Sequence, residues 1–273
     1  MTTRQLGAPI RRREDPRLLT GNGRYLDDLG AGALHAAFVR STSAHARIVD
    51  IDITDAWEVE GVEAIYTYED LEGPMAQPLP VLIPHPALTH ARTGYALANG
   101  EVNHVGEPVV MVVARDRYLA EDAAARIRVD YEALPVVVGV EAARSASVLV
   151  HDDAPGNVAA HLVQEVGDVE AALAAAPHTL TIPLTIERSA CMPMEGKGVL
   201  ARWDRDEQSM RMWSSTQTST GVRAAVAARL ELPLARIHCI APDVGGGFGV
   251  KIVHPWAEEL LVPWAARALG RDV

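Results

Sequence analysis

Four glycines lie within five positions in the segment 243–251, Asp-Val-Gly-Gly-Gly-Phe-Gly-Val-Lys. Bare glycine backbone costs conformational order, which is worthwhile where backbone must approach a ligand closely. A short apolar strand pattern at residues 236–240 precedes this glycine loop, and a helical pattern at residues 255–269 follows it. A strand, exposed amides, a lysine and a helix start together predict an anion-binding site.

The spacing of the glycines fits neither of the two common phosphate-binding loops. A dinucleotide fingerprint that starts at Gly245 requires glycine at position 250, where the chain has Val250. A Walker loop requires Gly-Lys followed by Ser or Thr, whereas the chain has Val250-Lys251-Ile252. A tight turn with a solvated lysine therefore stays open as the alternative to a binding loop.

Gln217 and Glu195 are two further residues whose setting singles them out. Gln217 follows a predicted strand and lies just inside a helix start, at the sheet edge where ligands usually bind. The alternative is that its amide satisfies a free backbone N–H of the helix. Glu195 lies in an apolar run, and apolar neighbours raise the pKa of a carboxyl, although a structural salt bridge is at least as good an interpretation.

Other polar residues fit structural roles better than catalytic ones. His238 lies within the apolar strand pattern, which predicts a hydrogen-bonded core histidine. Glu258 and Glu259 fall on adjacent faces of the last predicted helix, where a solvated surface is expected. The serines at 214, 215 and 219 lack the Gly-x-Ser-x-Gly motif of a nucleophile elbow.

Length and composition limit the class of protein. The chain has 273 residues, enough for two domains, and its net charge of −11 argues against nucleic acid or an anionic membrane as partner. No apolar run reaches the length of a membrane span, and the arginine-rich N-terminal segment has no apolar stretch of a secretory signal. Cys191 and Cys239 form neither a disulfide framework nor a Cys-x-x-Cys site, so we expect a reducing, cytoplasmic compartment.

The pattern of predicted elements indicates an α+β fold in two units. Residues 1–140 are a polar lead-in and a first unit, residues 141–166 a connector, and residues 167–273 a second unit without a closing strand. In the first unit, strands are predicted at residues 34–40, 47–53, 62–66, 108–114, 128–131 and 135–140, with Asp116 capping a helix after the fourth. In the second, Asp168 caps a short helix, strands are predicted at 179–188, 198–203, 210–213 and 236–240, and helices at 217–230 and 255–269.

Several motifs, in order along the chain, resemble one family. Residues 13–28 resemble the opening of the large, molybdopterin-binding subunit of the molybdenum hydroxylases, which include xanthine dehydrogenases, aldehyde oxidases and aerobic carbon monoxide dehydrogenases. Residues 106–116 and 129–135 are similar to the α/β-hammerhead domain of that subunit. Further similar motifs from its molybdopterin-binding domain lie at residues 167–172, 193–195, 215–217 and 243–251.

The resemblance implies a cofactor and residues that contact it. The expected cofactor is molybdenum-bearing molybdopterin in its cytosine dinucleotide form. Gln217 would hydrogen-bond the apical oxo ligand of molybdenum, and the backbone amide of Phe248, with Gly246, Gly247 and Gly249 beside it, would approach the metal and the pterin dithiolene. The cofactor's sulfurs would hold the metal, so no direct protein ligand is expected.

The chain also departs from the family pattern. Purine-hydroxylating members carry a substrate-binding glutamate directly after the lysine of the loop, where this chain has Ile252, so xanthine is not expected as substrate. Family large subunits are much longer than this chain. Their catalytic glutamate is therefore expected beyond Val273, and no catalytic residue is assigned within the sequence.

The sequence is therefore interpreted as an α/β-hammerhead domain followed by the first portion of a molybdopterin-binding domain. The implied reaction is hydroxylation of an aldehyde, N-heterocycle or similar small molecule, or oxidation of carbon monoxide, with water as oxygen source. The implied partners are a C-terminal molybdopterin-binding chain if the subunit is naturally split, an Fe–S small subunit and an FAD medium subunit. Two alternatives stay open: a non-catalytic scaffold, and an independent phosphate- or nucleotide-binding protein.

Overall fold

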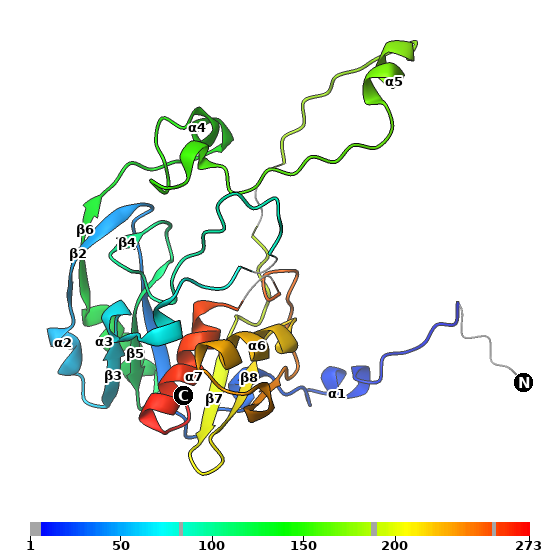
Figure 1. The fold of residues 1–273 in the computed structure, drawn as a ribbon. Coiled ribbons are helices and arrows are strands. Elements are labelled where there is room, and N and C mark those ends of the chain that lie inside the picture. The colour runs from blue at the N-terminus through cyan, green and yellow to red at the C-terminus, as the bar shows by residue number, and fades with distance from the viewer. Residues whose placement is uncertain (1–6, 82–83, 187–189, 253–254) are drawn as a thin grey trace, which may run out of the picture.

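The computed structural model describes residues 7–81, 84–186, 190–252 and 255–273. Within them, strands and helices follow one another without a strict βαβ order (Figure 1). The strands form three sheets of three strands each. This arrangement confirms the predicted α+β class.

The first sheet has the strand order β1–β5–β3 and is antiparallel throughout, with β1 at His35–Arg40, β5 at Pro108–Ala114 and β3 at Val62–Tyr66. Residues 109–114 of the central strand are all buried. A continuous apolar run is expected of a strand that is covered on both faces. For this reason the sequence predicts the bounds of β5 correctly, and the predicted bounds of β3 are also confirmed.

Helix α3 (Arg117–Arg126) covers one face of this sheet. Asp116 begins the helix by accepting a hydrogen bond from the backbone N–H of Leu119, with 3.0 Å between nitrogen and Oδ1, which confirms the predicted cap. Ala123 of the helix and Val110 of the sheet belong to one cluster of buried apolar side chains. The short helix α2, at Thr54–Trp57, packs beside α3.

The second sheet has the order β4–β2–β6, with β4 at Glu101–Val102, β2 at Ala46–Asp52 and β6 at Arg128–Ala133.

The strand predicted at residues 135–140 is wrong. Residues 134–138 are irregular and helix α4 (Val140–Ser145) follows, while the valines at 136, 138 and 140 are exposed. Among the described residues, this short valine-rich run has no neighbouring strand or core to pack on, and β-propensity acts through such packing.

The third sheet has the order β7–β8–β9. Strand β7 (Val199–Asp204) pairs antiparallel with β8 (Ser209–Ser214), and β8 pairs parallel with β9 (Ile237–Ile240). Helix α6 (Ser219–Arg229) connects the two parallel strands. A parallel pair needs such a crossover connection.

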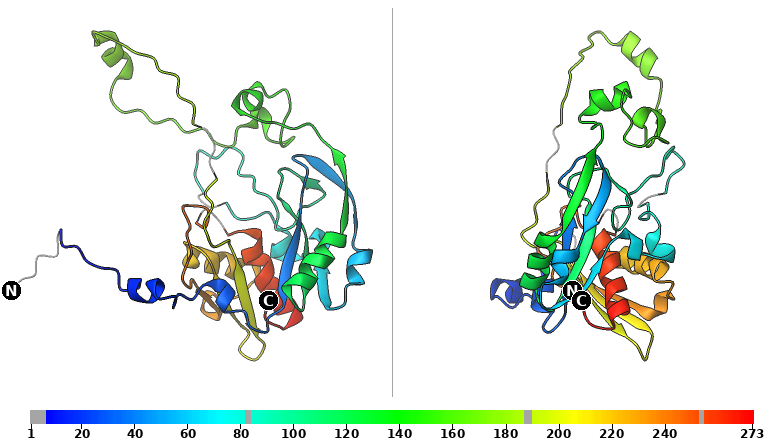
Figure 2. Two further views of the ribbon diagram at one scale, coloured as in Figure 1. Left: turned by 180° about the vertical axis from the view of Figure 1, so that it is seen from behind. Right: turned by 90° about the vertical axis from the view of Figure 1, so that its left-hand side faces the viewer.

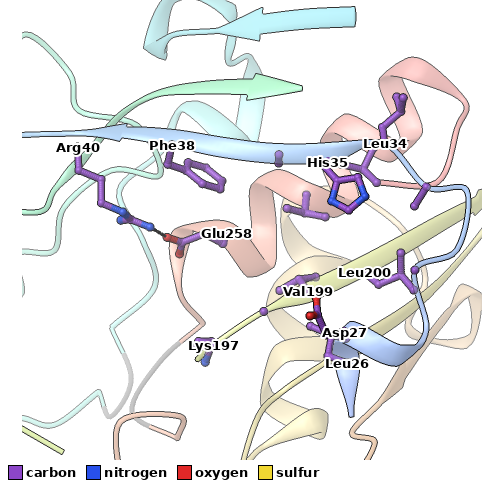
Figure 3. A pocket seen from close by; sticks show the side chains of 16 residues that line it. Leu26, Asp27, Leu34, His35, Phe38, Arg40, Lys197, Val199, Leu200 and Glu258 are labelled. Carbon is purple, nitrogen blue, oxygen red and sulfur yellow. Dashed lines mark hydrogen bonds and ion pairs between the residues drawn. The ribbon is translucent and has the colours of Figure 1, made fainter. Parts of the chain in front are cut away.

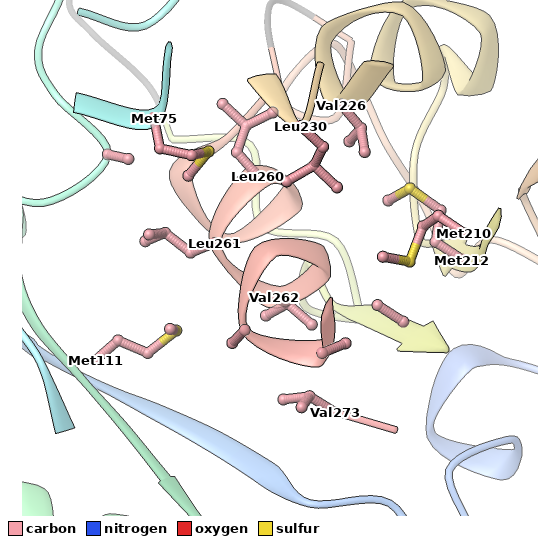
Figure 4. Close-up of a cluster of buried hydrophobic side chains, with 14 of the residues drawn as sticks. Met75, Met111, Met210, Met212, Val226, Leu230, Leu260, Leu261, Val262 and Val273 are labelled. Atoms are coloured by element: carbon pink, nitrogen blue, oxygen red, sulfur yellow. The ribbon is translucent and has the colours of Figure 1, made fainter. Parts of the chain in front are cut away.

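Helix α7 (Ala257–Leu269) lies between the first sheet and the third (Figure 4). Its fully buried Leu261 belongs to the same apolar cluster as Met111 of β5 and Met212 of β8, so one core joins the two units of the chain. Gly270 ends the helix in the left-handed conformation, with φ 64°, as its sequence position predicts.

Residues 162–186 form an arm that projects from the body of the molecule in all three ribbon views (Figures 1 and 2). The arm carries α5 (Val169–Ala175), which Asp168 caps as predicted. The strand predicted at residues 179–188 is wrong for residues 179–186, which are irregular. Its last two positions lie outside the described residues.

The remaining described elements are short. Helix α1, at Asp15–Leu19, belongs to the polar lead-in, whose described residues before this helix extend away from the body (Figures 1 and 2). Single turns of 3₁₀ helix are η1 at Leu26–Asp28, η2 at Tyr68–Asp70, η3 at Gly73–Ala76, η4 at Pro155–Asn157 and η5 at Leu234–Arg236. Among the described helices, none is long and apolar enough to cross a membrane.

Candidate functional site

The glycine loop and Gln217 meet at one edge of the third sheet. Strands β8 and β9 are parallel, so their carboxyl ends lie at the same edge. Gln217 follows β8, and residues 243–251 follow β9. Ligands of open sheets usually bind at this kind of edge.

A hydrogen bond joins Gln217 directly to the loop. Its side-chain oxygen Oε1 accepts from the backbone N–H of Gly249, with 3.0 Å between the two atoms, and its own backbone N–H donates to the carbonyl of Lys251 at 2.9 Å. The interpretation of Gln217 as a helix cap is therefore wrong. Because an N–H can only donate, it is the oxygen of the Gln217 amide that faces Gly249, and the amide nitrogen makes no hydrogen bond within the described residues.

The loop has a close contact and an unusual backbone conformation. A Cβ at Gly247 would lie 2.4 Å from Cδ of Gln217, so glycine is required for this close approach. Gly246 and Phe248 both have positive φ, at 105° and 51°. Phe248 is 71% exposed, and a bulky non-glycine residue at positive φ marks a strained backbone of the kind found at ligand-binding sites.

Three successive amides of the loop are available to a ligand. The N–H of Gly245 donates to Glu195 and that of Gly249 to Gln217. Within the described residues, the N–H groups of residues 246–248 make no hydrogen bond. Such a run of unpaired amides can bind an anion or another electron-rich group.

Lys251 lies beneath the loop and does not reach a ligand on its exposed side. Its side chain is 1% exposed, and Nζ donates to Ser215 Oγ at 2.7 Å and to the carbonyl of Glu195 at 2.9 Å, and lies 3.1 Å from Glu195 Oε2. The predicted part of this lysine in an anion site is therefore wrong, and so is the alternative of a solvated lysine. The groups that the loop offers on its exposed side are backbone amides.

Glu195 is the hub of this network. Its Oε2 accepts from Ser215 Oγ at 2.5 Å and from the N–H of Gly245 at 2.8 Å, besides pairing with Lys251. Burial alone would raise the pKa of the carboxyl, but the hydrogen bonds and the positive charge outweigh it and the pKa is lowered. The interpretation as a structural salt bridge is confirmed, and the proposed raised pKa is wrong.

A second buried network lies at the start of α7. Glu259 is fully buried, and its Oε1 accepts from Ser214 Oγ at 2.6 Å. Its Oε2 accepts from the N–H of Trp256 at 2.9 Å and lies 3.1 Å from Lys197 Nζ. The predicted solvated surface is wrong for this residue. Glu259 occupies the third position of the helix, where a glutamate often bonds back to the residue before the first turn, and that rule could have identified it.

The neighbouring Glu258 forms an ion pair with Arg40 of β1 (Figure 3). This pair and Lys197 line a cavity of about 340 Å³ between the lead-in, β1, β7 and α7. Burial lowers the pKa of Lys197 despite the nearby Glu259. The cavity lies where the two units of the chain meet.

Other predicted polar residues lie apart from the loop. His238 is exposed, so the predicted core histidine is wrong. Cys191 is exposed, and burial raises the pKa of the Cys239 thiol to about 11, so that this thiol stays protonated. Among the described residues, no three histidines, cysteines or carboxylates come together to hold a metal ion.

Two family models match successive parts of the chain. The aldehyde oxidase and xanthine dehydrogenase a/b hammerhead domain matches residues 20–135, and the molybdopterin cofactor-binding domain matches residues 150–273. The chain belongs to the molybdenum hydroxylase family. The match at residues 150–273 confirms the expected molybdopterin cofactor.

Known family members resemble the whole chain. It is 37% identical to the large subunit of nicotine 6-hydroxylase from Paenarthrobacter nicotinovorans, over 100% of the chain and 33% of that protein. It is 34% identical to the carbon monoxide dehydrogenase large chain of Afipia carboxidovorans, over 90% of the chain and 32% of that protein. The structure of quinoline 2-oxidoreductase from Pseudomonas putida 86 superposes on the chain with a TM-score of 0.87 and 39% identity. The match covers 97% of this chain and 33% of that one. The chain thus spans about a third of the length of the relatives it matches.

Proposed function

We propose that this chain forms part of the large subunit of a molybdenum hydroxylase and holds the metal end of a molybdopterin cofactor with Gln217 and the glycine loop. The observation that supports this most is the pairing of Gln217 with Gly249: in the part of the chain that the structure describes, one amide NH₂ and three successive backbone N–H groups stay unpaired at the same sheet edge. Hydrogen-bond donors without a competing acceptor suit the oxo, sulfur and phosphate groups of such a cofactor.

Each residue has a separate role in this proposal. The amide nitrogen of Gln217 donates to an oxo group on the metal, and the amides of Gly247 and Phe248 donate to the cofactor from the loop, with Gly246 and Gly249 allowing its close approach. No side chain of this chain binds the metal directly. When bound, the cofactor supplies a two-electron acceptor for hydroxylation with oxygen from water. The chain supplies donors that are already oriented.

We propose an N-heterocycle as the substrate class. Relatives with 37% and 39% identity are named for nicotine and quinoline, which are both N-heterocycles. Ile252, where purine-hydroxylating members carry glutamate, leaves no carboxylate to bind a purine at that position. The catalytic glutamate would lie in the rest of the large subunit, and we expect this chain to be inactive by itself.

We propose iron–sulfur and flavin subunits as the electron-accepting partners, in a cytoplasmic complex. The sequence of this chain contains only two cysteines, Cys191 and Cys239, which are too few for an iron–sulfur cluster. Both are free thiols, as expected in a reducing compartment.

The test is native mass spectrometry of the tagged chain, purified from its own cells, with molybdenum measured on the same sample. A molybdenum-containing complex with iron–sulfur and flavin subunits is expected. The variant Gln217→Ala should lower the ratio of molybdenum to protein and the turnover of an N-heterocycle. Unchanged molybdenum and turnover in that variant would favour the scaffold alternative, and turnover by the isolated 273-residue chain would contradict its proposed inactivity.

A further inference from the structure

The last part of the arm has the side-chain pattern of a strand. Leu180, Ile182, Leu184 and Ile186 alternate with residues that are mostly threonine, and all four are between 61% and 93% exposed. A strand that packs one face on a core and turns the other to water has this pattern. The apolar face exists here, but nothing in the described part of the chain covers it.

The backbone of residues 179–186 is likewise unpaired. Within the described residues it makes no hydrogen bond to another segment and belongs to none of the three sheets. An exposed segment with unpaired backbone groups and a row of apolar side chains is a template for pairing with another strand. The pattern therefore marks a docking segment.

Pro183 decides which edge of this strand can pair. In a strand, the N–H and C=O groups of one residue point to one edge and those of the next residue to the other. Pro183 has no N–H, so the edge formed by the odd-numbered residues is interrupted. The edge formed by the even-numbered residues keeps every donor and acceptor from Leu180 to Ile186.

Exposed apolar side chains also lie at the glycine loop. Residue Glu195 contacts the loop, since its N–H donates to the carbonyl of Gly245 at 3.2 Å. Met194, next to it, is 99% exposed, and Phe248 of the loop is also exposed. A partner that covers these two side chains would extend over the edge of the proposed cofactor site.

We infer that residues 179–186 form an edge strand that pairs, through its even-numbered residues, with a sheet in the part of the large subunit that completes the molybdopterin-binding domain. The occupant follows from two observations: the relatives are about three times as long as the chain, and Met194 and Phe248 at the glycine loop are exposed apolar side chains as well. The identity of the occupant rests on the proposed function. The orientation of the strand rests on Pro183 alone.

The first test is photo-crosslinking in the complete complex, purified from the source cells through a tag on this chain. A benzoylphenylalanine replaces Ile182 in one variant and Thr181 in the other. Position 182 should crosslink to a peptide of the large subunit's molybdopterin-binding domain, whether that domain is joined to this chain or separate. Crosslinks to a second copy of this chain, to an iron–sulfur or flavin subunit, or to nothing would overturn the inference.

A matched pair of proline substitutions tests the edge. Leu180→Pro removes an N–H from the even-numbered edge and should lower the Tm of the complete complex by at least about 3 °C. Thr181→Pro removes an N–H from the edge that Pro183 already interrupts and should have a much smaller effect. Leu180→Ala measures the contribution of the side chain. Equal effects of the two prolines would overturn the proposed orientation.

Molybdenum content of the same complex separates the two proposals. If molybdenum is present but position 182 crosslinks elsewhere, the docking inference fails and the proposed function stands. If the complex contains no molybdenum, the proposed function fails whatever the crosslinks show.

Discussion

Lys251 and Glu195 form an ion pair beneath the glycine loop, with 3.1 Å between Nζ and Oε2, and the lysine side chain is almost completely buried. The pair therefore holds the loop from the protein side and leaves the exposed side to backbone amides. Gln217 holds the loop at a second point, through Gly249. Because the protein's own hydrogen bonds fix the loop at both points, its donors are held in one orientation by the chain itself.

Removal of one charge from this pair should destabilise the chain strongly. Lys251→Met leaves the carboxylate of Glu195 without its cation, and breaking a buried pair in this way typically costs about 3 kcal/mol. Denaturant unfolding measures the loss. The control is Arg271→Met, which breaks an ion pair with Glu63 whose side chains are 50% and 34% exposed and should cost less than about 1 kcal/mol. Equal losses in the two variants would show that the buried pair has no special role.

The close contact between Gly247 and Gln217 predicts a specific loss of cofactor. Gly247→Ala places a methyl group where the Gln217 side chain lies, so the amide must move away from its bond with Gly249. We expect a lower ratio of molybdenum to protein in the assembled complex, with little change in the stability of the chain. The control is Gly196→Ala, because a Cβ at Gly196 has no atom within 4 Å. A normal molybdenum ratio in Gly247→Ala would contradict the proposed role of Gln217.

Asp243 predicts an acid-sensitive contribution to stability. Its hydrogen-bonded pairing with Arg17, together with the N–H of Arg24, lowers the pKa of the carboxyl from its ordinary value of 3.8 to about 2. A lowered pKa stabilises the folded state above the unfolded-state pKa, and this stabilisation is lost as the pH falls from about 4 to about 2. Asp243→Asn should therefore be less stable than wild type at pH 7 and should lose less stability over that acid range.

Urea unfolding at several pH values from 7 to 2.5 measures this difference. The pair is on the surface, so the difference between wild type and Asp243→Asn should shrink at high salt. Parallel stability curves for the two proteins would contradict the assignment.

Local patterns account for what the sequence predicts correctly. The bounds of β5 follow from a continuous apolar run and the start of α3 from the cap at Asp116, and neither depends on distant residues. Residues 179–186 have a good strand pattern, but a strand also needs a partner, and the described part of the chain offers none.

The site is predictable to a similar degree. The motifs identify Gln217 and the loop as candidates, and the parallel pairing of β8 and β9 explains why they lie together. The direction of the Lys251 side chain is set by Glu195, which is 56 positions away in the sequence, so no local pattern could predict it. The assigned cofactor contacts of Gln217 and residues 246–249 remain predictions.

The last prediction concerns the adjacent residues Glu258 and Glu259. Glu258 pairs with the partly exposed Arg40, whereas Glu259 is buried in the core. Glu259→Ala removes the acceptor of Ser214 Oγ and of the Trp256 N–H and leaves Lys197 without its counter-charge. Losing a buried ionic acceptor of this kind should lower the free energy of unfolding by about 3 kcal/mol.

Glu258→Ala removes only the pair with Arg40, whose side chain is 40% exposed, and should cost less than about 1 kcal/mol. Both variants lose the same charge from the same turn of α7, so their difference reports burial and not the helix dipole. Guanidinium unfolding of the two variants side by side measures it. Similar stabilities for the two variants would contradict the buried network. They would mean that Glu259 is solvated, as the sequence alone predicts, and that its bond with Ser214 does not hold the start of the helix.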